Sequence, residues 1–229
     1  MKKEHIILLV IAVVGFVSAV AYYLEWMTFV KITRLIFPVL MYLYYCQRIK
    51  KIQLAPTLII SIFWFTDLYS LCLTDNFSTL LVLGICSYSI LMFHGLMDMV
   101  KFRLSLSNIL SFTIIFSFIV FLCYSVIDLA LLELGSYKAF IIVYGIILSL
   151  NALIGAYNLN FRNRIHDLFF FFCATSFVFT DVSYLITEYY FKFKLMMIMN
   201  FILQLFGYYF VVRYFVSREM YMIKRLNNN

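Results

Sequence analysis

The strongest candidates for chemistry in this sequence are two aspartates, Asp67 and Asp181, because each interrupts a long apolar run. Asp181 lies within Ala174–Glu188, ATSFVFTDVSYLITE. A carboxylate inside hydrocarbon is costly, so such a residue normally faces the interior of a helix bundle and serves a function. Two carboxyl groups in one pocket can supply a general acid and a general base. We therefore identify Asp67 and Asp181 as candidate catalytic residues.

The composition defines the environment of these aspartates. Of the 229 residues, 65% are apolar and 13% are charged, and the mean hydropathy is +0.98. A soluble domain is nearer half apolar and a quarter charged, so the chain is predicted to be a multi-pass integral membrane protein. Its apolar runs are continuous and do not alternate, which favours helices over a β-barrel.

The prediction is an all-α membrane bundle of about eight transmembrane helices in a single domain, residues 1–229. Short loops leave no room for a separate soluble domain. The predicted spans are Ile6–Leu24, Thr28–Cys46, Ala55–Leu73, Ser78–Val100, Leu106–Val126, Tyr137–Tyr157, Leu168–Thr187 and Leu195–Val216.

The basic residues predict the orientation of the bundle. Positively charged loops stay in the cytoplasm, and one side of the predicted topology has many more of them. The twelve basic residues on that side are Lys2, Lys3, Arg48, Lys50, Lys51, Lys101, Arg103, Arg162, Arg164, Arg218, Lys224 and Arg225. Both termini are thus expected in the cytoplasm, and we expect the cell (inner) membrane as the location. The net charge of +7 reflects this topology, so no nucleic-acid partner is expected.

Polar residues from several helices are predicted to share one level in the outer half of the membrane. At a rise of about 1.5 Å per residue, Asp67 and Asp181 each lie roughly 9 Å from the outer end of their spans. Lys31 and Arg34 fall at a similar depth in the second span. The remaining members of the predicted layer, which we assign to substrate binding, are Tyr144, Asn200 and Gln204.

Two interpretations of this layer remain open. It can be an ion-paired layer that holds helices together, although interhelical polar contacts in membranes contribute only about 0.6–2 kcal/mol each. Alternatively it is a pocket in which the carboxylate near Lys31 or Arg34 is ionised while the other holds its proton. The sequence leaves open which aspartate is the acid and which the base. The scattered histidines and isolated cysteines form no metal-ligand pattern, so no metal or cofactor is expected.

Several short motifs resemble those of the YhhN-like lysoplasmalogenase family. Ala174–Tyr184, ATSFVFTDVSY, resembles the family motif G-x-x-x-F-x-x-S-D, with Phe177 on its phenylalanine and with Ala174 and Thr180 in place of its glycine and serine. Four further pairs resemble family motifs, although neighbouring residues differ. Thr66-Asp67 resembles Gly-Asp, Lys31-Ile32 resembles Lys-Pro, and Phe93-His94 resembles Phe/Gly-His. Gln204 and Tyr208 resemble Tyr-x-x-x-Gln, but in the reverse order. The pattern is typical of a divergent member.

The resemblance implies a membrane hydrolase that cleaves the vinyl ether bond of a lysoplasmalogen to a fatty aldehyde and a glycerophospho-base. Protonation of the double bond gives an oxocarbenium ion that water attacks, chemistry that a carboxylic acid and a carboxylate can support without metal. Asp67 and Asp181 then act as the acid/base pair. The substrate is a lysophospholipid-type amphiphile, whose phosphate Lys31 and Arg34 can meet. His94 is added to the substrate-binding candidates.

A non-enzymatic function is the alternative. A membrane transporter or lipid-binding protein can use the same polar layer for recognition or proton coupling. The chain lacks a pair of Gly/Pro-interrupted helices in corresponding halves, which counts against a transporter. The headgroup, the chain length and an ether or ester linkage are left open by the residues.

Overall fold

The computed structural model describes residues 3–72, 77–99, 106–133, 137–162, 164–190 and 193–227. Within these ranges the chain forms eight α-helices. They are α1 (Lys3–Tyr23), α2 (Met27–Ile49), α3 (Leu54–Cys72), α4 (Phe77–Met97), α5 (Leu106–Glu133), α6 (Lys138–Arg162), α7 (Ile165–Tyr189) and α8 (Lys194–Asn227).

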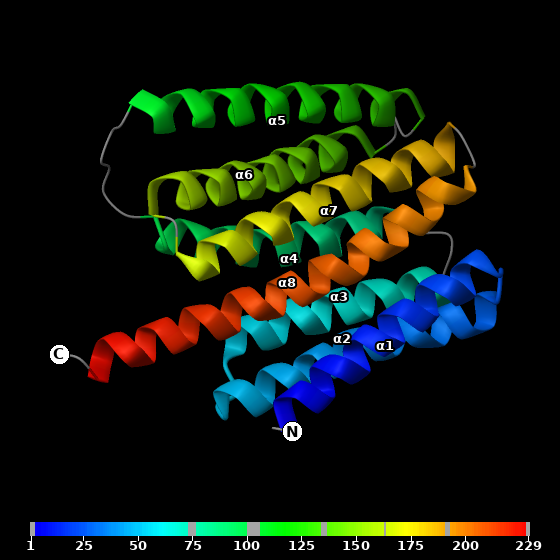
Figure 1. The fold of residues 1–229 in the computed structure, drawn as a ribbon. Coiled ribbons are helices and arrows are strands. Elements are labelled where there is room, and N and C mark those ends of the chain that lie inside the picture. Colours follow the sequence, from blue (N-terminus) through cyan, green and yellow to red (C-terminus); the bar gives the residue numbers. More distant parts are fainter. Residues whose placement is uncertain are drawn as a thin grey trace.

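Seven of these helices are long and apolar enough to cross a membrane. In α5 the described apolar stretch is Ile109–Leu122. The helices lie side by side in one bundle, and both termini lie toward the same end (Figure 1). The all-helical prediction is therefore confirmed, and the chain is a multi-pass integral membrane protein.

The observed helices extend beyond some predicted spans. The helix α8 continues past Val216 to Asn227, and α7 begins at Ile165, ahead of the predicted Leu168. Hydropathy marks only the apolar part of a helix, whereas Arg, Glu, Met and Lys in the segment after Val216 are good helix formers. The helix consequently continues where the apolar run stops.

The helix α8 connects the two parts of the bundle. It packs most extensively on α7 and also contacts α1, α2 and α3, so it lies between the α4–α7 group and the α1–α3 group (Figure 1). The helix α6 is in turn packed against α4, α5 and α7. Residues of α8 can therefore meet residues of both groups.

Two asparagines of α6 fix its alignment with α4. Asn151 donates its side-chain amide to the backbone carbonyl of Tyr88 at 3.0 Å, and Asn158 donates to that of Gly95 at 3.1 Å. The two asparagines are two helical turns apart and so lie on one face. Each such bond contributes about 1 kcal/mol in a membrane and sets the register of the two helices.

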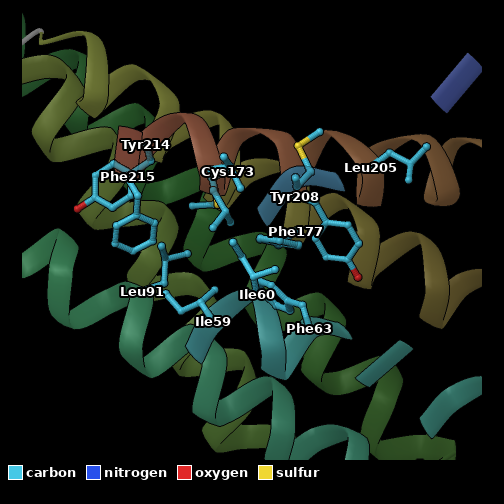
Figure 2. Close-up of a cluster of buried hydrophobic side chains, with 14 of the residues drawn as sticks. Ile59, Ile60, Phe63, Leu91, Cys173, Phe177, Leu205, Tyr208, Tyr214 and Phe215 are labelled. Carbon is cyan, nitrogen blue, oxygen red and sulfur yellow. The ribbon is translucent and has the colours of Figure 1, made fainter. Parts of the chain in front are cut away.

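The interior of the bundle is rich in aromatic side chains. Phe63 of α3 lies with its ring centroid 4.9 Å from that of Phe177 and 5.5 Å from that of Tyr208. Figure 2 shows these three rings together in a cluster to which α3, α7 and α8 all contribute. The cluster joins the two parts of the bundle beneath the polar residues described below.

A buried ion pair links α4 and α8 at the end of the bundle where both chain termini lie. Arg218 of α8 donates its Nε to both carboxylate oxygens of Asp98, at 3.0 and 2.9 Å. The Tyr214 hydroxyl donates to Asp98 Oδ2 at 2.7 Å. Because Asp98 follows the last residue of α4, the pair ties that end of α4 to α8.

The opposite end has an exposed ion pair. Lys194, the first residue of α8, donates to Glu25 Oε1 at 2.7 Å. This hydrogen bond and the charge of Lys194 lower the pKa of Glu25 from its ordinary value. Both side chains are solvent-exposed, so the pair contributes little to stability.

Loss of one partner of the buried pair is expected to destabilise the bundle. Arg218→Met leaves Asp98 buried without its cation, which costs about 3–5 kcal/mol. We expect a clear fall in the temperature at which the gel-filtration peak of the detergent-solubilised protein disappears. Lys224→Met, at an exposed position of the same helix, is the matched control. Equal melting temperatures for the two variants would contradict a structural role of the pair.

Candidate functional site

A cavity of about 510 Å³ opens among the helices and contains most of the predicted polar layer. Both aspartates line it. The predicted site residues on its wall are Arg34, Asp67, Tyr144, Asp181, Asn200 and Gln204, which come from α2, α3, α6, α7 and α8. The cavity also has a large apolar wall, including Leu81, Ile141 and Leu148. It is therefore suited to a molecule with a polar and an apolar part.

Asp67 is held by three donors from two other helices. Arg34 Nε and Gln204 Nε2 donate to its Oδ1 at 2.7 and 2.8 Å. The Tyr208 hydroxyl donates to Oδ2 at 2.5 Å. With 1% of its surface exposed, Asp67 is a buried carboxylate whose charge is balanced by Arg34 and whose two oxygens are both bonded.

Arg34 binds Asp67 through Nε only. Within the described ranges the terminal nitrogens of its guanidinium have no hydrogen-bond partner, and 30% of the side chain is exposed. Arg34 also lines the cavity. The guanidinium therefore has donors available for an anionic group that enters the cavity.

Asp181 has a different environment. The hydroxyls of Tyr144 and Tyr88 donate to its Oδ2 at 2.7 and 3.2 Å. In the described part of the chain, its Oδ1 has no hydrogen-bond partner and no Lys, Arg or His forms an ion pair with it. Asp181 is thus a half-buried carboxyl group in the cavity wall with one oxygen free to meet a ligand.

The contact between Tyr144 and Asp181 depends on a glycine. A Cβ at Gly84 of α4 would lie 2.5 Å from Tyr144 Cε2, well inside van der Waals contact. Only glycine lets α4 and the Tyr144 ring approach so closely. The asparagine bonds between α6 and α4 then bring Tyr88 and Tyr144 within reach of the same carboxyl group.

Asn200 of α8 binds the backbone of α7 next to Asp181. Its side-chain amide donates to the backbone carbonyl of Thr180 at 2.6 Å. This bond links α8 to α7 directly beside Asp181. Asn200 therefore positions the α7 wall, whereas Gln204, one turn further along α8, binds Asp67.

Two of the predicted substrate-binding residues lie apart from the cavity wall. Lys31 is exposed on α2 and does not line the cavity. His94 lies six residues beyond Tyr88 on α4 and packs edge-on against Phe215, with centroids 5.4 Å apart. Six residues correspond to roughly 9 Å along the helix, so His94 lies about that far from Tyr88 and the Asp181 carboxyl group that Tyr88 contacts.

Sequence reasoning did not assign Tyr88 and Tyr208 to the site, although both contact an aspartate. Tyr208 had a usable signal, because its spacing of four residues from Gln204 places both on one face of α8. The Gln204 amide also donates to the Tyr208 hydroxyl at 2.9 Å. Tyr88 had no comparable signal, since a tyrosine in an aromatic-rich span is usually a packing residue.

Comparisons of the chain with protein-family models, with curated proteins and with solved structures find no match. The resemblance to the YhhN-like family therefore stays a prediction. No three His, Cys, Asp or Glu side chains among the described residues come together in an arrangement that could hold a metal ion.

Alanine substitution of two helical glycines is expected to have opposite effects on stability. In Gly84→Ala the new Cβ forces Tyr144 to move, and overpacking of this kind costs about 1–3 kcal/mol. In Gly15→Ala the Cβ would lie 3.6 Å from Phe37, an ordinary contact, so helix propensity should raise stability by about 0.5–1 kcal/mol. Thermal unfolding of both variants in detergent measures the difference. A stabilised Gly84→Ala would refute the close approach.

Proposed function

We propose that the protein is a membrane hydrolase of the lysoplasmalogenase type, which cleaves the vinyl ether bond of a lysoplasmalogen. The observation that carries the proposal is the contrast between two carboxyl groups on one cavity. Asp67 has an arginine partner and two further donors, whereas Asp181 is bonded by tyrosine hydroxyls on one oxygen only. Environments that separate two carboxyl groups in this way are typical of acid–base catalysis.

Asp181 is the proton donor in this proposal. Its free Oδ1 gives a proton to the β-carbon of the vinyl ether, which is the alkenyl carbon next to the ether-bearing carbon. The double bond is thereby converted to an oxocarbenium ion. The Asp181 carboxylate formed in this step then takes a proton from the water that attacks that ion. The resulting hemiacetal breaks its carbon–oxygen bond to give a fatty aldehyde and the glycerol hydroxyl of the headgroup.

Asp67 contributes a fixed negative charge. Because both of its oxygens already accept hydrogen bonds, it is less accessible to water than Asp181. A preorganised charge of this kind stabilises a developing cation without reorganisation. Asp67 also holds Arg34, and Arg34 in turn presents its terminal nitrogens to the phosphate of the substrate.

We propose in addition that both termini are cytoplasmic and that the cavity lies in the outer half of the cell membrane. The support for this orientation is that both termini lie at the same end of the bundle (Figure 1) and that basic residues gather there. Basic residues at that end include Lys50, Lys51, Arg164, Lys224 and Arg225. Positively charged segments of this kind remain on the cytoplasmic side.

Substitution of either aspartate is expected to abolish most of the activity. With purified protein and a vinyl-ether lysolipid, Asp181→Asn should reduce aldehyde release by about 10²–10⁴-fold, because the amide cannot donate the proton. Asp67→Asn should also reduce kcat, since the fixed charge is lost. Glu25→Gln, which changes an exposed carboxylate at the surface, should keep the activity of the unsubstituted protein.

Unchanged aldehyde release from both aspartate variants would exclude the proposed mechanism. Binding of the lysolipid without any product would instead favour a lipid-binding protein or a transporter. Flux of the lipid across proteoliposomes that depends on a proton gradient would identify a transporter.

Arg34 is expected to act on substrate binding. In Arg34→Lys a single ammonium replaces the guanidinium fork and cannot bond both Asp67 and a phosphate with the same geometry. We expect KM for a vinyl-ether lysophospholipid to rise by about tenfold, corresponding to loss of one charge-assisted contact of about 1.4 kcal/mol. The matched control is an alkenyl glycerol without phosphate, whose KM should change little. An equal increase for both substrates would contradict a phosphate contact.

A further inference from the structure

A second hollow lies on the side of the bundle between α5 and α7, with its base on α6. It has a volume of about 280 Å³. Its wall is apolar apart from Thr175, whose hydroxyl is already bonded to the backbone carbonyl of Phe171 at 2.9 Å. The residues that line it are Ile114, Ile115, Phe118, Ile119, Leu122, Ala152, Phe171, Thr175, Val178 and Phe179.

This groove adjoins the cavity that contains the aspartates. Ile119 and Leu122 of α5 and Val178 of α7 line both spaces. Ile119 and Val178 are buried between the two spaces, with exposed fractions of 6% and 9%. These side chains therefore form the boundary between a polar chamber and an apolar groove, and we call this boundary the neck.

The direction of the groove follows α7. Asp181, Val178, Thr175 and Phe171 succeed one another at spacings of three or four residues, so they lie along one face of the helix. The distance from Asp181 to Phe171 along the helix axis is roughly 15 Å. The groove thus leads away from Asp181, past the middle of α7, toward the end of the helix at Ile165.

The outer rim of the groove faces the surroundings of the bundle. Ile114, Phe118 and Phe179 are 63%, 53% and 44% exposed. In a membrane this surface meets lipid chains, so an apolar ligand can enter sideways without crossing the polar chamber.

We propose that the groove holds the hydrocarbon chain of a single-chain amphiphile whose polar end lies in the aspartate cavity. The chain passes the neck at Ile119 and Val178 and lies along α5 and α7, with the reacting group near Asp181. We expect a groove of this volume to hold no more than one chain. The identity of the polar end rests on the proposed function.

Photo-crosslinking tests this placement without requiring catalysis. The probe is a non-hydrolysable 1-O-alkyl lysophospholipid with a diazirine at the end of its chain, bound to the full-length protein in nanodiscs. Mass spectrometry of the peptides should find the label mainly in residues 114–122 and 171–179. A tenfold excess of the same lipid without diazirine should remove most of it.

Substitution at the neck should close the groove. Ile119→Trp should lower labelling of these two segments at least tenfold, whereas Phe121→Trp, at a 68% exposed position of the same helix outside the groove, should leave it unchanged. Ile119→Phe, a smaller change, keeps the test decisive if the tryptophan variant aggregates. It should give an intermediate loss.

The proposal is overturned if the label is spread over the lipid-facing helices or is not removed by competitor, because the groove would then hold bulk membrane lipid. Label concentrated on other helices also overturns it. Competable label in the groove together with absent aldehyde release supports the chain site and contradicts only the hydrolase function. Aldehyde release without groove labelling supports the hydrolase function and overturns the chain site.

Discussion

The negative charge of Asp67 inside the bundle is the constraint around which the other polar residues are arranged. A carboxylate in this position requires a cation and further donors, because water cannot solvate it there. Arg34 of α2, Gln204 of α8 and Tyr208 of α8 supply them. Three helices are thereby fixed at one level. The remaining guanidinium nitrogens of Arg34 are left in the cavity, so the interaction that stabilises the charge also creates a site for an anion.

Asp181 faces the same cavity under opposite conditions. Its neighbours are neutral hydroxyls from α4 and α6, which reach it because Gly84 leaves space for the Tyr144 ring and because Asn151 and Asn158 fix the register of these helices. Its environment therefore depends on helix packing and involves no ion pair. One carboxyl group of the cavity thus has a cationic partner and the other has only neutral partners. This difference is the basis of the proposed acid–base chemistry.

The polar groups at the other end of the bundle have a structural role. Asp98, Arg218 and Tyr214 form a buried network with good geometry, and none of the three lines the aspartate cavity. They join α4 to α8 and so support the helix from which Tyr88 projects. In the same way, the aromatic cluster of Phe63, Phe177 and Tyr208 joins α3, α7 and α8 beneath the aspartates (Figure 2).

The helical membrane bundle is predictable from the amino-acid sequence, because long apolar runs can satisfy their backbone in a membrane only as helices or closed barrels, and these runs do not alternate as barrel strands would. It also identified six of the polar side chains that line the cavity, both aspartates among them, since a fixed rise per residue converts position into depth. Depth alone does not specify rotation about the helix axis or the packing of neighbours. Only the tertiary structure therefore turned Arg34 toward Asp67, left Lys31 exposed, brought Tyr88 to Asp181 and put His94 beside Phe215. The partners that distinguish the two aspartates come from helices far apart in the chain, and their distances are set by packing.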